Sequence, residues 1–205
     1  MVKTNINLFA EGEVVYTDGG VLAEFAWVLV VLPFIAALII TFAGKSLPLK
    51  GAEIALGTIG IIFIYSLALM YLHVTEGVAT EFFINVGNIG QFDIEFGWVV
   101  DGLSIMMYFV VGLVALLVFI YATNYMEGEI RYTFFFTSLT LFAGSMLVLV
   151  SSPTLIQILI GWELVGVCSY LLIGHYWEVK DNSSAAMKAF ITNKIADVGL
   201  MIGII

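Results

Sequence analysis

Several charged side chains lie inside stretches of this sequence that are otherwise apolar, and Glu163 is the clearest case. It lies near the middle of the apolar segment 155–176. An acidic residue at the centre of a bilayer costs about 2.5–3.5 kcal/mol. Removal from water favours the neutral carboxyl, whereas a nearby cation favours the carboxylate. A carboxyl held between these effects takes up and releases protons. We therefore favour a proton relay at Glu163 over the alternative, a structural hydrogen bond to a neighbouring helix.

A second charged group lies in the next apolar segment, 185–205. Lys194 and Asp197 have the i, i+3 spacing that places two side chains on the same side of a helix. An ion pair between them would lower the burial cost of both charges without necessarily stabilising the fold. Asn193 precedes Asp197 by one helical turn and could donate a hydrogen bond to it. A static pair and a part of the proton relay are both compatible with this spacing.

Three further residues are candidate accessory groups. Tyr170 follows Glu163 by two helical turns and could supply a hydroxyl on the same face, where Gly166 would permit the close approach of another backbone. Lys188 lies near the start of the segment 185–205, so its long side chain can reach the interface, and we favour an anchoring role. His175 ends the segment 155–176, and imidazole titrates near neutral pH, which suits a point of proton uptake. For His175 we favour the simpler interpretation of a residue at the membrane interface.

Other chemistries find no support in the sequence. The single cysteine, Cys168, excludes an internal disulfide and a multi-cysteine metal site. No histidine cluster, glycine-rich phosphate loop or nucleophile triad is present, so we expect no metal, no bound cofactor and no redox chemistry in this chain. Seven Lys and Arg residues form no basic patch, which argues against nucleic acid as a partner.

The composition indicates which elements must position these charges. Hydrophobic residues make up 61% of the 205 residues and charged residues only 11%, against about 25% charged in ordinary soluble domains. A helix needs about 20 mostly apolar residues to cross a bilayer. Six segments meet this condition, and the sequence therefore predicts an all-α polytopic membrane protein with about six transmembrane helices in one domain, 1–205. The expected helices are 26–43, 54–72, 102–122, 132–150, 155–176 and 185–205.

One connection has a different pattern. Between residues 92 and 100 apolar and polar residues alternate, and 82–86 repeats this period of two, which is typical of half-buried strands. Gly87-Asn88-Ile89-Gly90 could turn the chain between them. The sequence therefore predicts a β-hairpin over 82–100, lying on the membrane surface between the second and third helices.

The distribution of basic residues predicts the orientation. With the N-terminus outside, the outer segments contain only Lys3, whereas the inner loops contain four basic residues: Lys45, Lys50, Arg131 and Lys180. Cytoplasmic loops carry such an excess of Lys and Arg. We therefore expect the N-terminus and the hairpin on the outer, periplasmic side.

Three motifs carry a resemblance to a known family. They are Gly161-Trp162-Glu163-Leu164-Val165-Gly166-Val167-Cys168-Ser169-Tyr170-Leu171-Leu172-Ile173-Gly174, Ala186-Met187-Lys188-Ala189-Phe190-Ile191-Thr192-Asn193-Lys194-Ile195-Ala196-Asp197-Val198-Gly199, and Asp101-Gly102-Leu103-Ser104. Together they resemble the N-terminal part of the antiporter-like subunits of respiratory complex I, most of all the distal type, called subunit L in bacterial NADH-quinone oxidoreductase and subunit 5 in mitochondria.

The resemblance implies roles for particular residues. Glu163 matches the family's glutamate of the fifth helix, which pairs there with a lysine on a broken seventh helix that has no counterpart in these 205 residues. Lys194 matches a position where the family often has Arg, and Asp197 matches a recurrent acid. The family pattern Arg-x-Gly-Asp becomes Lys-Ile-Ala-Asp here, which keeps the charges but loses the glycine and the planar guanidinium.

The resemblance also implies a function and a cellular setting. It implies proton translocation coupled to quinone reduction elsewhere in a complex, with NADH, FMN, iron–sulfur clusters and quinone bound by other subunits. The expected partners are other complex I membrane subunits and the lipid bilayer of a bacterial inner (cytoplasmic) membrane. Family members contain two inverted five-helix repeats, so we expect an N-terminal fragment of a longer subunit. The alternatives are the large subunit of a multi-subunit sodium/proton antiporter and a non-transporting membrane scaffold.

Overall fold

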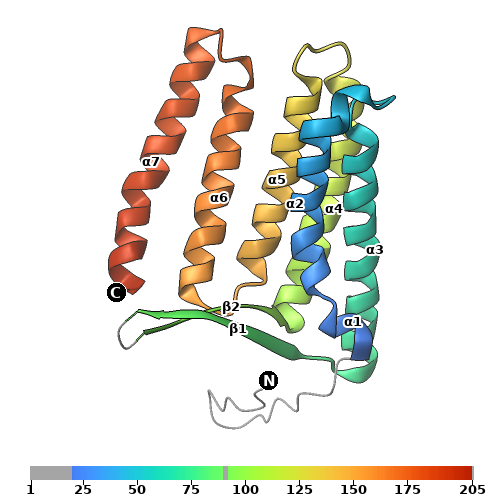
Figure 1. Ribbon diagram of the computed structural model, residues 1–205, viewed down its shortest axis with the longest axis vertical. Helices are drawn as coiled ribbons and strands as arrows, with labels where there is room; N and C mark the ends of the chain where they lie inside the picture. The colour runs from blue at the N-terminus through green and yellow to red at the C-terminus, as the bar shows by residue number, and fades with distance from the viewer. Residues whose placement is uncertain (1–19, 90–91, 205) are drawn as a thin grey trace.

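The computed structural model describes residues 20–89 and 92–204 as a bundle of long helices with a two-stranded hairpin across one end (Figure 1). This architecture confirms the predicted all-α polytopic fold with a small hairpin between the second and third long helices. The long helices are α2 (Trp27–Ala43), α3 (Ala52–Glu76), α4 (Gly102–Tyr125), α5 (Tyr132–Val150), α6 (Leu155–Ile173) and α7 (Lys180–Ile204), and the short elements are α1 (Gly20–Glu24), η1 (Gly44–Ser46) and η2 (Gly174–Tyr176).

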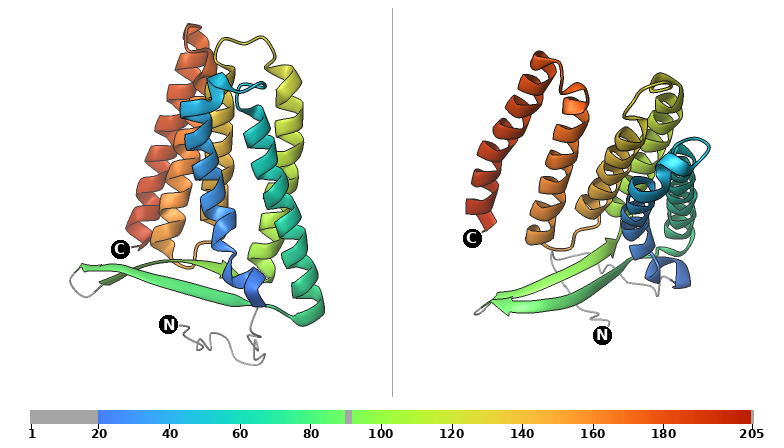
Figure 2. Two further views of the ribbon diagram at one scale, coloured as in Figure 1. Left: turned by 45° about the vertical axis from the view of Figure 1, so that its right-hand side comes forward. Right: turned by 45° about the horizontal axis from the view of Figure 1, so that its top comes forward.

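The helices α2 to α6 are long and apolar enough to cross a membrane. Helix α7 has 25 residues and runs beside α6, but its charged residues make it less apolar than the others (Figures 1 and 2). Five spans therefore follow from length and composition among the described residues, where six were expected. The difference arises because α7 contains the charges of the candidate site.

The helix ends differ from the expected ones mainly where the chain is polar. Helix α5 has the expected bounds, but α7 begins at Lys180, five residues before the start of the apolar segment at Ala185. A hydropathy pattern marks only the apolar part of a helix, and Lys180 to Ser184 are polar. Helix α3 continues to Glu76 and ends where Gly77 adopts a left-handed conformation with φ of +67°.

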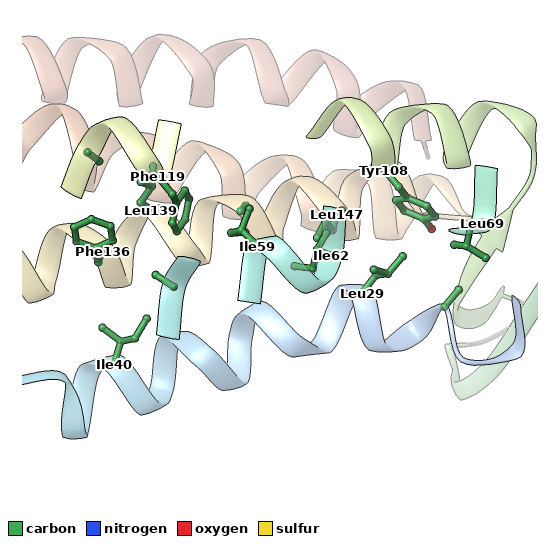
Figure 3. Close-up of a cluster of buried hydrophobic side chains, with 14 of the residues drawn as sticks. Leu29, Ile40, Ile59, Ile62, Leu69, Tyr108, Phe119, Phe136, Leu139 and Leu147 are labelled. Atoms are coloured by element: carbon green, nitrogen blue, oxygen red, sulfur yellow. The ribbon is translucent and has the colours of Figure 1, made fainter. Parts of the chain in front are cut away.

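The apolar core lies among α2, α3, α4 and α5. Its largest buried side chains include Tyr108, Phe119 and Phe136, which come from α4 and α5 (Figure 3). Helix α6 packs against α5, and α7 packs mainly against α6 and η2. The bundle therefore consists of a four-helix core with α6 and α7 added in succession on one side, and the candidate charges lie on this added pair.

The hairpin consists of β1 (Thr80–Ile89) and β2 (Phe92–Val100), paired antiparallel. Its pairing register shifts between Asn85 and Gly87, which indicates a β-bulge. After the bulge, β1 continues through Ile89. The residues Gly87-Asn88-Ile89, which the sequence analysis placed in the turn, therefore belong to the strand. Gly90, the last residue of the expected turn, lies outside the described residues.

The hairpin is attached to the beginning of α6 by side chains and backbone groups. Gln157 is buried and forms two hydrogen bonds with Gly97: its Oε1 accepts from the backbone N–H at 2.9 Å, and its Nε2 donates to the carbonyl at 2.8 Å. The N–H of Val99 donates to the carbonyl of Ser151 at 2.9 Å, and the hydroxyl of Thr154 donates to the backbone carbonyl of Glu95 at 3.2 Å. These bonds fix the hairpin at one end of α6.

Candidate functional site

Glu163 and Lys194 form an ion pair between α6 and α7. The side chains retain 31% and 34% of their exposure, so the pair lies at the edge of the helix–helix contact. Each residue lies near the middle of its helix. A cation that can favour the carboxylate of Glu163 is therefore available within the described residues, from Lys194 on the neighbouring helix α7.

Asp197 completes a triad around Lys194. The Oδ2 of Asp197 lies 3.8 Å from the Nζ of Lys194, the separation that their spacing led us to expect. Asp197 is the most buried of the three charges, with 5% of its surface exposed. Its Oδ1 accepts a hydrogen bond of 2.9 Å from the indole Nε1 of Trp162 on α6. Lys194 is thus shared by a carboxylate on each helix.

Trp162, and not Asn193, is the hydrogen-bond donor that the structure gives Asp197. Asn193 is exposed on α7. Sequence analysis missed Trp162 because its partner lies on another helix, which helical spacing does not reveal. A signal was present, since Trp162 directly precedes Glu163 and its indole N–H is a hydrogen-bond donor inside an apolar segment.

Among the described residues Tyr170 forms no hydrogen bond with Glu163, and it belongs instead to an aromatic contact beside Lys194. The ring of Tyr170 lies 5.3 Å from that of Phe190, and the Nζ of Lys194 lies 5.1 Å from the Phe190 ring centroid. Two helical turns correspond to about 11 Å along the axis, too far for a direct hydrogen bond. Tyr170 is connected to the triad through Phe190 and Lys194.

The close backbone approach occurs at Gly161, and the expectation for Gly166 was wrong. A Cβ on Gly161 would lie 2.8 Å from the Cα of Leu149 on α5, whereas a Cβ on Gly166 would meet nothing within 4 Å. Gly161 therefore allows α6 to pack tightly against α5, two residues before Glu163. Gly166 faces open space in the described part of the chain.

Lys188 and His175 lie outside the triad. Lys188 is exposed and lines a groove of about 470 Å³ along α7, with Ser184 and Thr192 on the same face. Because α7 begins at Lys180, Lys188 lies more than two turns inside the helix. The anchoring role was inferred from a helix that begins at residue 185, which would place Lys188 in its first turn. His175 is in η2, where α6 ends, and is only 4% exposed; its position at the membrane interface stays a prediction.

The chemistry that the site offers is that of acids and bases. Within the described ranges 20–89 and 92–204, no group of three or more His, Cys, Asp or Glu residues could hold a metal ion. Cys168 is buried, with its sulfur 3.8 Å from the hydroxyl of Ser145. Two carboxyls that share one ammonium group can exchange protons or charge partners, and the triad is therefore a candidate proton-transfer site.

Comparisons with known proteins show which families two parts of this chain match. Residues 87–136 match the family described as "NADH-Ubiquinone oxidoreductase (complex I), chain 5 N-terminus". Residues 152–205 match the family described as "NADH:quinone oxidoreductase/Mrp antiporter, TM", and this match contains the whole triad. The two matches together cover the hairpin from Gly87 onward, the helices α4, α6 and α7, and the first five residues of α5.

Two curated relatives show the extent of the similarity. The chain is 39% identical to "NAD(P)H-quinone oxidoreductase chain 5" of Synechocystis sp. over 90% of its length, and 36% identical to "NAD(P)H-quinone oxidoreductase subunit 5, organellar chromatophore 1" of Paulinella chromatophora over 89%. In both cases it spans only 28% of the relative.

A solved structure supports the fold alone. It belongs to the membrane-bound sulfane sulfur reductase, an archaeal respiratory membrane complex, and it superimposes with a TM-score of 0.73 at 13% identity over 88% of this chain and 36% of that one. The sequence matches and the shared fold lead to one conclusion. This chain is a multi-pass membrane protein that belongs to the family of antiporter-like subunits of respiratory complex I, and it corresponds to the N-terminal part of the subunit 5 type.

Proposed function

We propose that this chain translocates protons as a membrane subunit of an NADH:quinone oxidoreductase, and that Glu163, Lys194 and Asp197 are its relay. The observation that carries the proposal is the ion pair between Glu163 on α6 and Lys194 on α7, with Asp197 3.8 Å from the same ammonium group. Charged residues inside a membrane mark ion pathways more often than static contacts. The names of the relatives support the same activity.

The relay depends on which carboxyl holds the cation. At an effective dielectric constant of about 20, a unit charge pair at the Lys194–Asp197 separation is attracted by about 4 kcal/mol. This energy corresponds to roughly a thousandfold change in proton affinity. While Lys194 contacts Glu163, the carboxylate is favoured there. If Lys194 moves toward Asp197, Glu163 loses its cation in a medium of low polarity and takes up a proton.

Trp162 gives Asp197 a role different from that of Glu163. Its indole N–H donates to Asp197, which is nearly inaccessible, and this charge-assisted bond holds the carboxylate in place. Glu163 keeps 31% of its side chain exposed and accepts no comparable fixed bond among the described residues. We infer that Asp197 is the stationary anion to which Lys194 can turn, while Glu163 loads and releases the proton.

The rest of the machinery belongs to partner subunits in this proposal. NADH, FMN, iron–sulfur clusters and quinone would be bound elsewhere in the complex, and this chain would contribute only the movement of charge through the membrane. Its partners would be other membrane subunits and the surrounding lipid, in the inner membrane of a bacterium. Lys45, Lys50 and Arg131 lie in the connections at the end opposite the hairpin, and Lys180 begins α7 at the same end (Figure 1), which supports a periplasmic hairpin and N-terminus.

The experiment replaces Glu163 in the full-length subunit within its complex. Glu163→Gln keeps the shape and hydrogen-bonding capacity of the side chain but cannot ionise. We expect assembled complexes with this substitution to lose most proton translocation and the coupled quinone reduction, and Glu163→Asp to retain part of both. Protons translocated per electron pair are measured in membrane vesicles after assembly has been verified. Normal pumping by the assembled Glu163→Gln complex would leave this residue a structural role.

A sodium/proton antiporter is the second candidate function, because the family matched by residues 152–205 is named for the Mrp antiporter as well. The two functions differ in what drives proton movement. A respiratory subunit translocates protons when NADH is oxidised, whereas an antiporter dissipates an imposed pH gradient when sodium is added. Vesicles that contain the complete complex and a pH-sensitive dye distinguish these responses.

A further inference from the structure

His175 is a buried titratable side chain that the relay does not use. It lies in η2, where α6 ends, with 4% of its surface exposed. Three aromatic rings surround it: Phe135 at 5.4 Å, Phe134 at 6.4 Å and Tyr176 at 4.9 Å between ring centroids. Neither Nδ1 nor Nε2 has a hydrogen-bond partner among the described residues. A buried polar atom without a partner is uncommon and calls for an explanation.

A cavity adjoins this histidine. It has a volume of about 290 Å³ and lies between the ends of α5, α6 and α7. Since a water molecule occupies about 30 Å³ in the liquid, the cavity has room for several. His175 lies next to two of its lining residues, because Gly174 directly precedes the histidine and the Phe134 ring stacks on it. Arg131 and Ser183 give the wall polar groups that can hold water.

The same cavity extends toward the triad through Tyr170. This tyrosine lines the cavity, and its ring contacts Phe190, above which the Nζ of Lys194 lies. His175 therefore contacts one lining residue, Phe134. Another lining residue, Tyr170, contacts Phe190, which in turn contacts Lys194. The residues that line the cavity are at or beside the ends of α5, α6 and α7 that lie opposite the hairpin, and the proposed orientation assigns this end of the bundle to the cytoplasm (Figure 2).

The charged groups around His175 come from two loops. Arg131 and Glu129 precede α5, and Glu178 follows η2; these three act electrostatically on the histidine. Arg131 is bound to Glu178 at 2.6 Å, and its guanidinium lies 5.4 Å from the Trp177 ring. Helix α5 presents Phe134 and Phe135 to His175, and Tyr176 is its titratable neighbour in η2. Burial and Arg131 oppose protonation of the histidine, whereas the two acids favour it.

We propose that His175 is the proton-loading group on the cytoplasmic side and that the 290 Å³ cavity connects it with Lys194 through Tyr170. This inference rests on the proposed function of the triad. The imidazole takes a proton from water at the cytoplasmic face and becomes imidazolium. It then returns to the neutral form as the proton passes along cavity water, past Tyr170, to the Glu163 carboxylate, which accepts it while Lys194 contacts Asp197. No electron is transferred, and one proton is carried in each cycle.

The experiment measures the pH dependence of proton translocation in the assembled complex. His175→Phe keeps an aromatic ring in the pocket but removes the titratable group, and Tyr176→Phe is the matched control in the same turn. Proton capture limits the rate most at alkaline cytoplasmic pH, where we expect His175→Phe to pump about fivefold more slowly than the control and to approach it on acidification. His175→Gln, which retains hydrogen bonding, should give the same altered profile.

Chemical rescue separates loading from packing. Imidazole added to the cytoplasmic side should restore pumping by His175→Ala at alkaline pH, because the shortened side chain leaves room for it beside the cavity. Assembled His175→Phe and His175→Gln complexes with the pH profile of the control would overturn the inference. Glu163→Gln, measured in parallel, distinguishes the two proposals. If it abolishes pumping while the His175 variants match the control, the loading role alone fails; if it pumps normally, the relay itself fails.

Discussion

Gly161 and Gly166 form a matched pair that tests how tightly α6 must pack to present Glu163. The two glycines lie in the same helix, on either side of the glutamate, but differ in their surroundings. A Cβ on Gly161 would lie 2.8 Å from the Cα and 2.9 Å from the N of Leu149, whereas nothing lies within 4 Å of one on Gly166. The obstruction at Gly161 is backbone, which cannot move aside without separating α5 from α6.

The expected energies follow from these distances. Overpacking by one methyl group typically costs 1–3 kcal/mol, and the higher helix propensity of alanine returns about 1 kcal/mol. Gly161→Ala should therefore lower the free energy of unfolding by up to about 2 kcal/mol, whereas Gly166→Ala, which meets no obstruction, should change it little or raise it by up to about 1 kcal/mol. Because α6 is displaced toward α7, Gly161→Ala should also disturb the contact of Glu163 with Lys194.

The assay is unfolding of this 205-residue chain in mixed detergent micelles, followed by circular dichroism as denaturing detergent is added. Wild type and both variants are compared under identical conditions. If Gly161→Ala were as stable as Gly166→Ala, the tight contact between α5 and α6 would not exist as described. A loss of stability in both variants would instead place another segment against Gly166.

Four further predictions concern other contacts. Trp162→Phe removes the only indole donor to Asp197 within the described structure and should lower the free energy of unfolding by about 1.5–3 kcal/mol; a stability equal to that of wild type would contradict the bond. Gln157→Ala should cost about 1–2 kcal/mol and accelerate hydrogen exchange at the Gly97 amide, and unchanged exchange would show that the hairpin is held elsewhere. A hydrogen bond to its own backbone and the Arg131 guanidinium hold the pKa of Glu178 below its ordinary value of 4.5, so its stabilising effect is complete above that pH and is lost as the pH falls below it. The difference in melting temperature between wild type and Glu178→Gln should therefore shrink on acidification, and a constant difference would refute the assignment. Finally, a cysteine at the exposed Asn85 of β1 should react with an impermeant thiol reagent from the periplasmic side of intact cells, whereas labelling only after lysis would reverse the orientation.

The helices could be predicted from the sequence because a bilayer imposes a simple condition on each one separately. The apolar segment 132–150 predicted the bounds of α5 correctly, and the alternation of polar and apolar residues after Gln91 predicted the second strand of the hairpin. The errors occurred where the chain leaves the apolar region. Polar residues extend α7 to Lys180, and a bulge after Asn85 carries β1 through the expected turn.

The charges of the site could be identified from the sequence, but most of their partners could not. Glu163, Lys194 and Asp197 are conspicuous because the bilayer penalises each of them, whereas the identity of a partner depends on how two helices are rotated and displaced relative to each other. Spacing within one helix correctly brought Lys194 near Asp197. It suggested Asn193 and Tyr170 as further partners, while the contacts across α6 and α7 supply Trp162 and Phe190 instead.

The position of the triad in the bundle bears on how it could work. Helices α2 to α5 enclose the apolar core, whereas α7 packs mainly against α6 and η2 (Figures 1 and 3). A relay needs one charge that remains fixed and one that exchanges partners. Asp197 meets the first requirement through its burial and the Trp162 bond, and Lys194 meets the second because its flexible side chain reaches carboxylates on both helices. Tight packing at Gly161 keeps α6 on the rigid core, so the movement that transfers a proton can be confined to the Lys194 side chain and the less constrained α7.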